Sequence, residues 1–256
     1  MDTILKQCLG IAVSKLSLSL SLGHLTNDLS KKFESHEDVS NDLMGYKTIV
    51  KWLEKSLDIS VNFIIVMEAT GVYHQHVAHY LYERGYDICI MQSGRVKRYA
   101  QSLDQRSKTD ALDSRMLSML GLERTLRLWH PPSLALQELK LLSRERSSLL
   151  KDKTVESNRQ GALLSSVNVN AKASKRHKAR LKLLKLQIAS IEQEMRNLIS
   201  EDQALKRKLC FLESIPSLSF ISAATIVGET LGFESVTNGK QLASYAGYDV
   251  AVSYTH

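Results

Sequence analysis

The sequence predicts an α/β domain followed by a mainly helical second half, and three observations carry this prediction. The chain opens with strand patterns in which apolar and polar residues alternate. Strand and helix patterns then alternate as far as Glu123, and only helical periodicity continues after Pro131 and Pro132. Because the residue before a proline avoids the helical conformation, the two prolines also mark a boundary.

Three strands are predicted first. Leu9 to Val13 is a short apolar run, and the leucines from Leu16 to Leu22 alternate with serines at the period of two that is typical of a half-buried strand. Gly23 and Asn27-Asp28 supply turn residues around a third strand near Leu29 to Phe33. Together these runs predict a β-meander.

Helix and strand patterns follow the meander. Apolar residues from Tyr46 to Leu57 recur at helical spacing, and Asn62 to Met67 is a short apolar run before a turn, as expected for a buried strand. We then expect a helix from Tyr73 to Arg84, a strand from Asp87 to Met91 and a helix from Thr109 to Glu123. This order of elements is the topology of the ribonuclease-H-like α/β fold.

Acidic residues occupy positions from which this fold can bind a divalent metal ion. Glu68 directly follows the fourth strand, and Asp110 and Asp113 are three residues apart near the start of the last helix, so their carboxylates share a face. Mg²⁺ (or Mn²⁺) prefers such ligands, and two ions can clamp both oxygens of a reacting phosphodiester. The alternative for Glu68 is a solvated turn residue. The alternative for the aspartate pair is an interaction with the exposed backbone amides at the start of the helix. The agreement of fold order and spacing favours the metal site.

The first strand should offer a further acid at its centre, but Ala12 stands there, and a methyl group binds no metal. Two interpretations stay open: an acid lost by engineering or decay, or acids that are only structural. We favour the first, because an Asp to Ala change in a carboxylate cluster removes repulsion together with a ligand. Folding should therefore survive and catalysis should not.

Three segments resemble the signature segments of the DEDD-type insertion-sequence transposases related to the pilin invertase Piv. They are Gly10 to Lys15, Glu68 to His74 and Lys108 to Asp113, and the Glu-Ala-Thr-Gly-x-Tyr-His run is the most specific. Ile215 to Glu229 and Lys240 to Gly247 are similar to the start of that family's second domain. The resemblance thus extends from residue 9 to the last residue.

The resemblance implies a DNA transposase or site-specific recombinase of a mobile element, with a Holliday-junction-resolvase-like catalytic domain and a structured bridge RNA that pairs with donor and target DNA. It makes Glu68, Asp110 and Asp113 three of the four metal-site acids and places Ala12 where the first belongs. It also implies a serine nucleophile a little beyond the Ala-Gly segment, where Ser253 is the nearest substitute. We therefore expect the chain as given to be catalytically impaired. We also expect it to form a homodimer or a larger homo-oligomer.

The positive charge is concentrated in the middle of the chain. Residues 92–185 hold 21 Lys and Arg against 8 Asp and Glu, and residues 172–185 hold seven cations and no acid. Nucleic acid neutralises such a run by releasing its counterions, whereas the alternative is a solvated helix face. The residues predicted to bind nucleic acid are Arg95, Lys97, Arg98, Arg106, Lys108, Lys172, Lys175, Arg176, Lys178, Arg180, Lys182 and Lys185.

The second half predicts a helical hairpin. A long helix after Ser133 is broken around Ser165 to Ser174, and apolar residues then recur at spacings of three and four from Leu181 to Leu198. This heptad seam predicts an antiparallel hairpin or an intermolecular coiled coil, with the basic run at its tip.

Ile215 to Ser219 is a weak match to a helix–hairpin–helix, and an ordinary helix entrance is the alternative. We expect three parts: the catalytic domain at 1–128, the hairpin linker at 129–208 and the start of a carboxyl-terminal transposase domain at 209–256.

Composition excludes several classes of protein. The 256 residues carry a net charge of +7, and three widely spaced cysteines form neither a disulfide framework nor a paired zinc motif. His74, His76 and His79 are interpreted as core or surface histidines rather than zinc ligands. The sequence shows neither a membrane-spanning run nor an export signal, so we expect a prokaryotic cytoplasmic protein without a membrane partner.

Functions of different classes remain after this step. Besides the recombinase, the chain could be a nucleic-acid-binding remnant without catalysis, or a metal-dependent junction or RNA nuclease that uses only the first domain. A serine-glycine segment beyond His256 would favour the recombinase, and a true terminus there would favour the non-catalytic nucleic-acid-binding remnant.

Overall fold

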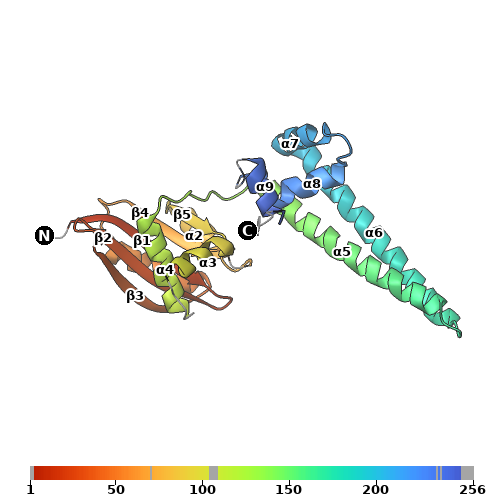
Figure 1. The fold of residues 1–256 in the computed structure, drawn as a ribbon, viewed down its shortest axis with the longest axis horizontal. Helices are drawn as coiled ribbons and strands as arrows, with labels where there is room; N and C mark the ends of the chain where they lie inside the picture. The colour runs from red at the N-terminus through yellow and green to blue at the C-terminus, as the bar shows by residue number, and fades with distance from the viewer. Residues whose placement is uncertain (1–2, 70, 104–108, 235, 237, 249–256) are drawn as a thin grey trace, which may run out of the picture. The chain divides into compact units, whose positions relative to one another are not determined.

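The computed structural model describes residues 3–69, 71–103, 109–234, 236 and 238–248, and the chain divides into two compact units, 1–131 and 132–256 (Figure 1). The first unit is built on a five-stranded sheet in the order β3-β2-β1-β4-β5. Neighbours pair antiparallel in the β1–β2–β3 meander and parallel from β1 through β4 to β5. The strands are β1 (Ile4–Val13), β2 (Ser17–Thr26), β3 (Lys31–Ser40), β4 (Phe63–Glu68) and β5 (Ile88–Met91).

Helices cover both faces of this sheet. A core around Leu9, Ile11 and Met67 packs against α1 (Leu43–Ser56) and α2 (Gln75–Tyr82) on one face. A second core, which includes Cys8 and Val66, packs against α3 (Ser93–Ser102) and α4 (Asp110–Glu123) on the other. The three-layer arrangement and the strand order confirm the ribonuclease-H-like fold that the element order predicts.

Two local predictions are wrong. Gly23 is not a turn residue but lies inside β2, and the third strand runs over Lys31–Ser40 instead of Leu29 to Phe33. β3 is an edge strand and largely exposed, so its sequence lacks the apolar alternation of a half-buried strand. The prediction also missed α3, because only Val96 and Tyr99 of its ten residues are buried.

The first unit ends in an extended segment that covers the edge of β5. The backbone N–H of Trp129 donates to the Ile88 carbonyl at 2.6 Å, and the Cys89 thiol donates to the Arg127 carbonyl at 3.1 Å. The Trp129 ring also meets the ring of His79 edge to face at 5.2 Å. These contacts satisfy backbone groups that an open edge strand would leave unpaired.

The second unit is helical. Its elements are α5 (Leu134–Leu164), α6 (Ala171–Glu201), α7 (Gln203–Glu213), α8 (Phe220–Glu229) and α9 (Gly239–Tyr245). The helices α5 and α6 pack against each other as a hairpin, and the seam residues Ile188, Ile191 and Met195 are buried. The break between them is shorter than predicted, because Asn170 already caps α6 by accepting from the Ala173 N–H. Pairing of this hairpin with a second chain stays a prediction.

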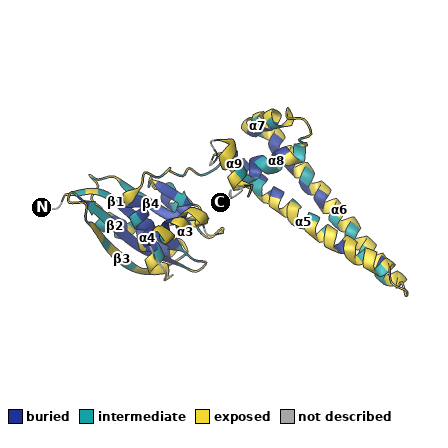
Figure 2. Cartoon of the chain, in the orientation of Figure 1, coloured by how far each residue is buried: buried dark blue, intermediate teal, exposed yellow. Residues whose placement is uncertain are grey.

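The core of the second unit lies at one end of the hairpin. Leu139, Met195 and Val227 belong to one buried cluster that joins α5, α6, α7 and α8. Figure 2 shows that the rest of the hairpin is mostly exposed. Because α7 and α8 share this core with the hairpin, they belong to the same compact unit, and the boundary between the two units lies after Pro131. The three-part functional division stays a prediction.

The connection between α7 and α8 is a tight turn. Ser217 adopts a positive φ of 69°, and the Ser219 hydroxyl caps α8 by accepting from the Ser222 N–H at 3.2 Å. This geometry provides the ordinary helix entrance considered above, formed without glycine. Among the described helices, none is both long and apolar enough to cross a membrane.

Candidate metal centre and nucleic-acid interface

Position 12 and Glu68 lie next to each other at the carboxyl edge of the sheet. Strands β1 and β4 pair in parallel up to Ile11 opposite Met67, and the next residues along the two strands are Ala12 and Glu68. In parallel strands such partners point to the same face. The sequence therefore brings the empty first-acid position and the second acid side by side.

The face that they share is the one covered by α4. A Cβ at Gly10 would lie 1.9 Å from the Ser114 carbonyl oxygen, and one at Gly121 would lie 2.2 Å from the Cys8 sulfur and 2.9 Å from a Val66 methyl. Side chains two residues apart on a strand share a face, so Ala12 follows Gly10 and Glu68 follows Val66. Both positions therefore lie on the α4 side of the sheet.

Close contacts hold α4 in this place. The Ser118 hydroxyl donates to the Cys8 carbonyl at 2.8 Å, and a Cβ at Gly23 would come within 2.4 Å of the Ser118 oxygen. Gly121 lies against Cys8, whereas Ser114 lies against Gly10, which is further along β1. The helix therefore runs antiparallel to β1, and its amino-terminal turn extends toward position 12.

The predicted aspartates are in that turn. Thr109 caps α4 by accepting from the Leu112 N–H at 3.2 Å, and Asp110 and Asp113 occupy the first turn, the former exposed and the latter half-buried. Carboxylates at a helix amino terminus are also favoured by the helix dipole. Both acids thus lie toward the same edge as Glu68.

These acids do not form an assembled metal site in the part of the chain that the structure describes. No three carboxylate, imidazole or thiol side chains there are grouped so that they could hold a metal ion. Ala12, which lies between β2 and Glu68 on the α4 face, presents a methyl group and no metal ligand. Ser253, the nearest substitute for a nucleophile, lies outside the described residues.

Ala69 and Tyr73, which come shortly after Glu68, are each held by a hydrogen bond. The Ala69 N–H donates to the Met91 carbonyl at 2.9 Å, and Asn41 donates from its amide to the Tyr73 carbonyl at 3.2 Å. A groove beside Tyr73 is lined by residues that include Lys15, Asn41 and His76. Sequence reasoning missed Asn41, although its place directly before the helix-capping Asp42 is a signal for a residue with a local structural role.

Several predicted basic residues are exposed on α3. Arg95, Lys97 and Arg98 face outward, while Val96 and Tyr99 of the same helix are buried. Arg106 and Lys108 lie outside the described residues. The outer face of α3 is therefore a basic surface on the same side of the sheet as α4.

The basic run on the hairpin is exposed as well, with one correction. All seven cations between Lys172 and Lys185 are exposed, but Arg180 does not simply project into solvent. Its Nε lies 2.5 Å from Oε1 of the buried Glu156 on α5, and His177 Nδ1 lies 2.6 Å from the same oxygen. Arg180 therefore connects the two helices of the hairpin, whereas no described ion pair engages the other six cations.

The charge of Glu156 is maintained by these partners. Burial acts to raise the pKa of its carboxyl, but hydrogen bonds from Arg180 and His177 outweigh that effect, so the pKa lies below its usual value. Sequence reasoning missed this glutamate. The signal was its position, since Glu156 continues the seven-residue spacing of Leu142 and Leu149 along the inner face of α5.

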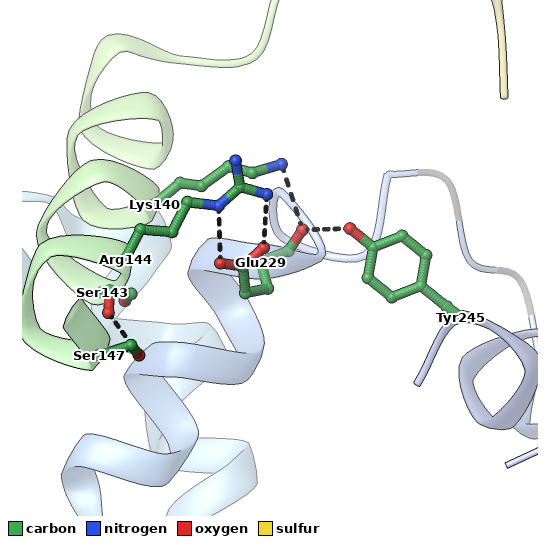
Figure 3. A network of polar contacts seen from close by, with 6 residues as sticks. All are labelled: Lys140, Ser143, Arg144, Ser147, Glu229 and Tyr245. Atoms are coloured by element: carbon green, nitrogen blue, oxygen red, sulfur yellow. Dashed lines mark hydrogen bonds and ion pairs between the residues drawn. The ribbon is translucent and has the colours of Figure 1, made fainter. Parts of the chain in front are cut away.

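A further polar network fastens α9 to the rest of the second unit. Arg144 on α5 forms a bidentate pair with Glu229 on α8, at 2.9 and 3.0 Å, and the Tyr245 hydroxyl donates to the Glu229 carbonyl at 2.9 Å (Figure 3). Burial, with the nearby Arg144 charge, lowers the pKa of Lys140, which approaches the same carbonyl. The network fixes the segment that resembles the start of a second transposase domain.

The chain is similar in sequence to known proteins. A family model for the IS110 DEDD domain, described as "Transposase", matches residues 10–169. The pilin gene-inverting proteins of Moraxella lacunata and Moraxella bovis are each 26% identical to the chain over 211 residues, which cover 81% of this chain. The chain spans 63% of the length of these two relatives.

Two solved structures also share similarity with part of the chain. They are Thermus thermophilus RuvC in complex with a Holliday junction substrate and T. thermophilus RuvC alone. Each is 9% identical, and the matches cover 48% of this chain and 99% of theirs, with TM-scores of 0.37 and 0.36.

Proposed function

The chain belongs to the IS110 family of transposases, and from this premise we propose that it acts in DNA strand cleavage and exchange for a mobile element. The observation that carries the proposal is the strand register, which sets position 12 beside Glu68 on the face that α4 covers with its acidic first turn. Fold alone does not define a function, but acids at this edge provide a site for phosphodiester chemistry.

In this proposal Glu68, Asp110 and Asp113 hold Mg²⁺ or Mn²⁺. Three carboxylates fit a hard divalent cation in type, with Glu68 at the end of β4 and both aspartates in the first turn of α4. A bound cation would activate the attacking oxygen and stabilise the leaving oxygen of a phosphodiester. Because position 12 supplies no ligand, this chain binds the cation weakly and is catalytically impaired.

The partners in this proposal are donor and target DNA and a structured guide RNA. The exposed cations of α3 and of the hairpin are suited to phosphate contacts, which position nucleic acid without reading its sequence. A second copy of the chain and a serine nucleophile, for which Ser253 is the candidate, complete the proposal. Sequencing of RNA that co-purifies with the protein tests the guide directly, and its absence would contradict this part.

The metal site is tested by restoring the first acid. Ala12→Asp adds a hard ligand beside Glu68, so titration calorimetry should show tighter Mn²⁺ binding than in the unchanged chain. Ala12→Asn is the matched control, because it has nearly the same shape without the charge. Glu68→Gln in the Ala12→Asp background should remove the gain. Equal affinity with Ala12 and with Asp at this position would overturn the assigned site.

A second candidate function is nucleic-acid binding without catalysis. The methyl group at position 12 favours it, because binding through the exposed cations requires no metal. Under either function the pure 256-residue protein should bind DNA or RNA in Mg²⁺ without cutting it, and strand cleavage by it would show that either the acid missing at position 12 or the serine nucleophile is dispensable. The assay that separates the two functions uses Ala12→Asp, because gain of DNA cleavage in Mg²⁺ would favour the recombinase, and binding without cleavage would favour the second function.

A further inference from the structure

A groove just beyond the ends of β1 and β4 is lined by polar side chains that no other described residue engages. Its lining includes Lys15 in the turn after β1, Asn41 just before α1, and Tyr73, Gln75 and His76 at or just before the start of α2. Within the described part of the chain, the side chains of Lys15, Gln75 and His76 are exposed and form no hydrogen bond or ion pair. The groove therefore offers a cation, an amide and an imidazole to a ligand.

Exposed apolar and aromatic side chains lie beside these polar groups. Val72 and Tyr73 line the same groove and are 57% and 40% exposed, and Leu16 in the turn after β1 is 78% exposed. A Cβ at Gly71 would lie 3.9 Å from the Tyr73 ring, so a larger side chain at this position would lie against the ring. Exposed apolar side chains that gather beside polar groups mark an interaction site.

Hydrogen bonds hold the backbone that carries the Tyr73 ring. The Asn41 amide nitrogen donates to the Tyr73 carbonyl at 3.2 Å and to the Ser14 carbonyl at 2.8 Å. The amide oxygen of Asn41 accepts from the Tyr46 hydroxyl at 2.7 Å, which orients the amide. Asn41 thus connects the turn that carries Lys15 with the segment that carries Tyr73. A binding surface whose backbone is already ordered loses less conformational freedom when a ligand binds.

We propose that this groove binds an unpaired nucleotide of a DNA strand, with its base stacked on Tyr73 and its phosphate beside Lys15. The inference rests on the proposed function, since it names a contact with the same DNA substrate. Only an unpaired base can offer its face to the Tyr73 ring, because neighbouring base pairs cover both faces of a base in a duplex. Gln75 and His76 then form hydrogen bonds with the edge of that base. Stacking on an aromatic ring accepts every base, so the contact selects unpaired DNA and not a sequence.

The place of the groove favours DNA over RNA or a peptide as its occupant. Lys15 comes shortly after the end of β1, and Tyr73 comes shortly after Glu68 at the end of β4. A nucleotide in the groove would therefore belong to the strand on which the proposed chemistry takes place. Its phosphate would also supply the opposite charge that Lys15 lacks among the described residues.

The experiment measures binding of the full chain to two fluorescent DNA strands of equal length by anisotropy. One is an oligothymidylate, and the other has the same phosphates but abasic sugars. Tyr73→Ala should weaken binding of the oligothymidylate by about 5–150-fold and leave binding of the abasic strand and of a fully paired duplex nearly unchanged. Tyr73→Phe keeps the ring and should bind like the unchanged chain. Tyr248→Ala is the matched control, because it removes an exposed tyrosine outside the groove and should change neither affinity.

Two further measurements test the contact without Tyr73→Ala, so that the inference stays testable if this variant does not fold. An oligothymidylate in which 5-iodouracil replaces thymine forms a crosslink under ultraviolet light with an aromatic side chain stacked on the base. Mass spectrometry of the unchanged chain should place that crosslink at Tyr73. Lys15→Gln should weaken oligothymidylate binding and reduce the slope of log affinity against log salt by about 0.7, because one phosphate contact is lost.

Four results would overturn the inference in different ways. Equal affinity of the unchanged chain for the oligothymidylate and the abasic strand, or the absence of a crosslink at Tyr73, would refute the groove as a nucleotide site and leave the proposed function intact. Equal losses on both strands with Tyr73→Ala would reduce Tyr73 to a structural role. Tighter Tyr73-dependent binding of an oligouridylate of the same length would overturn the assignment to DNA. A chain that binds neither DNA strand would contradict DNA as a partner in the proposed function, and the inference with it.

Discussion

At the scale of single residues, glycine determines how closely α4 approaches the sheet. The helix passes over β1 where a side chain at position 10 would collide with the backbone at Ser114 and Ser118. A collision with backbone cannot be relieved by turning a side chain, so the helix or the strand must move. The position of Asp110 and Asp113 therefore depends on the absence of a methyl group on the opposite strand.

Gly10→Ala should lower the free energy of unfolding by about 1–3 kcal/mol, the usual range for overpacking. Gly94→Ala is the control in the same unit, because a Cβ there meets nothing within 4 Å and alanine favours the helix. It should leave stability unchanged or raise it by up to about 1 kcal/mol. Urea unfolding curves measure both, and equal effects of the two variants would contradict the close-approach argument.

Residues differ in how far sequence can reveal their roles. Glu68, Asp110 and Asp113 were candidates from their places in a strand and helix pattern, and their assignment as ligands stays a prediction. Asn41 could not be found in this way, because its partners Ser14 and Tyr73 meet it only after the sheet forms. A side chain whose role lies in joining distant segments leaves no local pattern in the sequence.

At the scale of elements, the hairpin combines an exposed basic surface with one buried charge. Lys175, Arg176 and Lys178 are exposed, and replacing them with Gln should change the melting temperature little. RNA or DNA affinity should fall, and each lost phosphate contact should reduce the slope of log affinity against log salt by about 0.7–0.9. Arg180 is left unchanged in this variant because it pairs with Glu156.

Fluorescence anisotropy over a range of salt concentrations measures that slope. Lys206→Gln with Arg207→Gln is the control, since these exposed cations of α7 lie outside the basic run. The control should change the slope less for each charge removed. An unchanged slope in the triple variant would mean that the basic run is only a solvated helix face.

Glu156 makes the stability of the hairpin depend on pH. Its pKa is lowered in the folded state, so its charge stabilises the fold above the unfolded pKa of about 4.3, and this contribution is lost as pH falls through the folded value. Glu156→Gln should therefore melt below the unchanged chain at pH 7, and the gap should narrow toward pH 3. Thermal melting followed by helical circular dichroism measures the gap in melting temperature at each pH. Glu145→Gln, at an exposed site on α5, should show no such change, and a gap that is constant with pH would refute the argument.

Elements were predictable where the two sides of a strand or helix differ in side-chain type. The seam of α6 is visible because its buried side is apolar, whereas β2 is buried on both faces, not half-buried as predicted, and its period of two separates leucines from small serines. The third strand and α3 were missed or misplaced, because β3 lies at the sheet edge and α3 buries only two side chains. The contrast between two faces, rather than secondary structure itself, is what the sequence displays.

At the scale of the whole molecule, the candidate acids and most of the net positive charge lie in different units. The acids of the candidate centre belong to residues 1–131, which hold 16 Lys and Arg against 15 Asp and Glu. Residues 132–256 hold 18 against 12, and they include the basic run. The strand-rich unit is therefore nearly neutral, and most of the net charge is on the helical unit. The prolines at positions 131 and 132 made this boundary visible in the sequence.

Each unit has its own hydrophobic core, so cutting the chain between Pro131 and Pro132 should give two pieces that fold separately. The piece 132–256 should bind RNA or DNA with a salt dependence close to that of the whole chain, because counterion release follows the phosphate contacts of its basic surface. The piece 1–131 should bind more weakly, through α3. Far-ultraviolet circular dichroism checks the folding of both pieces, and anisotropy checks their binding. If the folded piece 1–131 retained most of the salt slope, α3 and not the hairpin would be the main nucleic-acid interface.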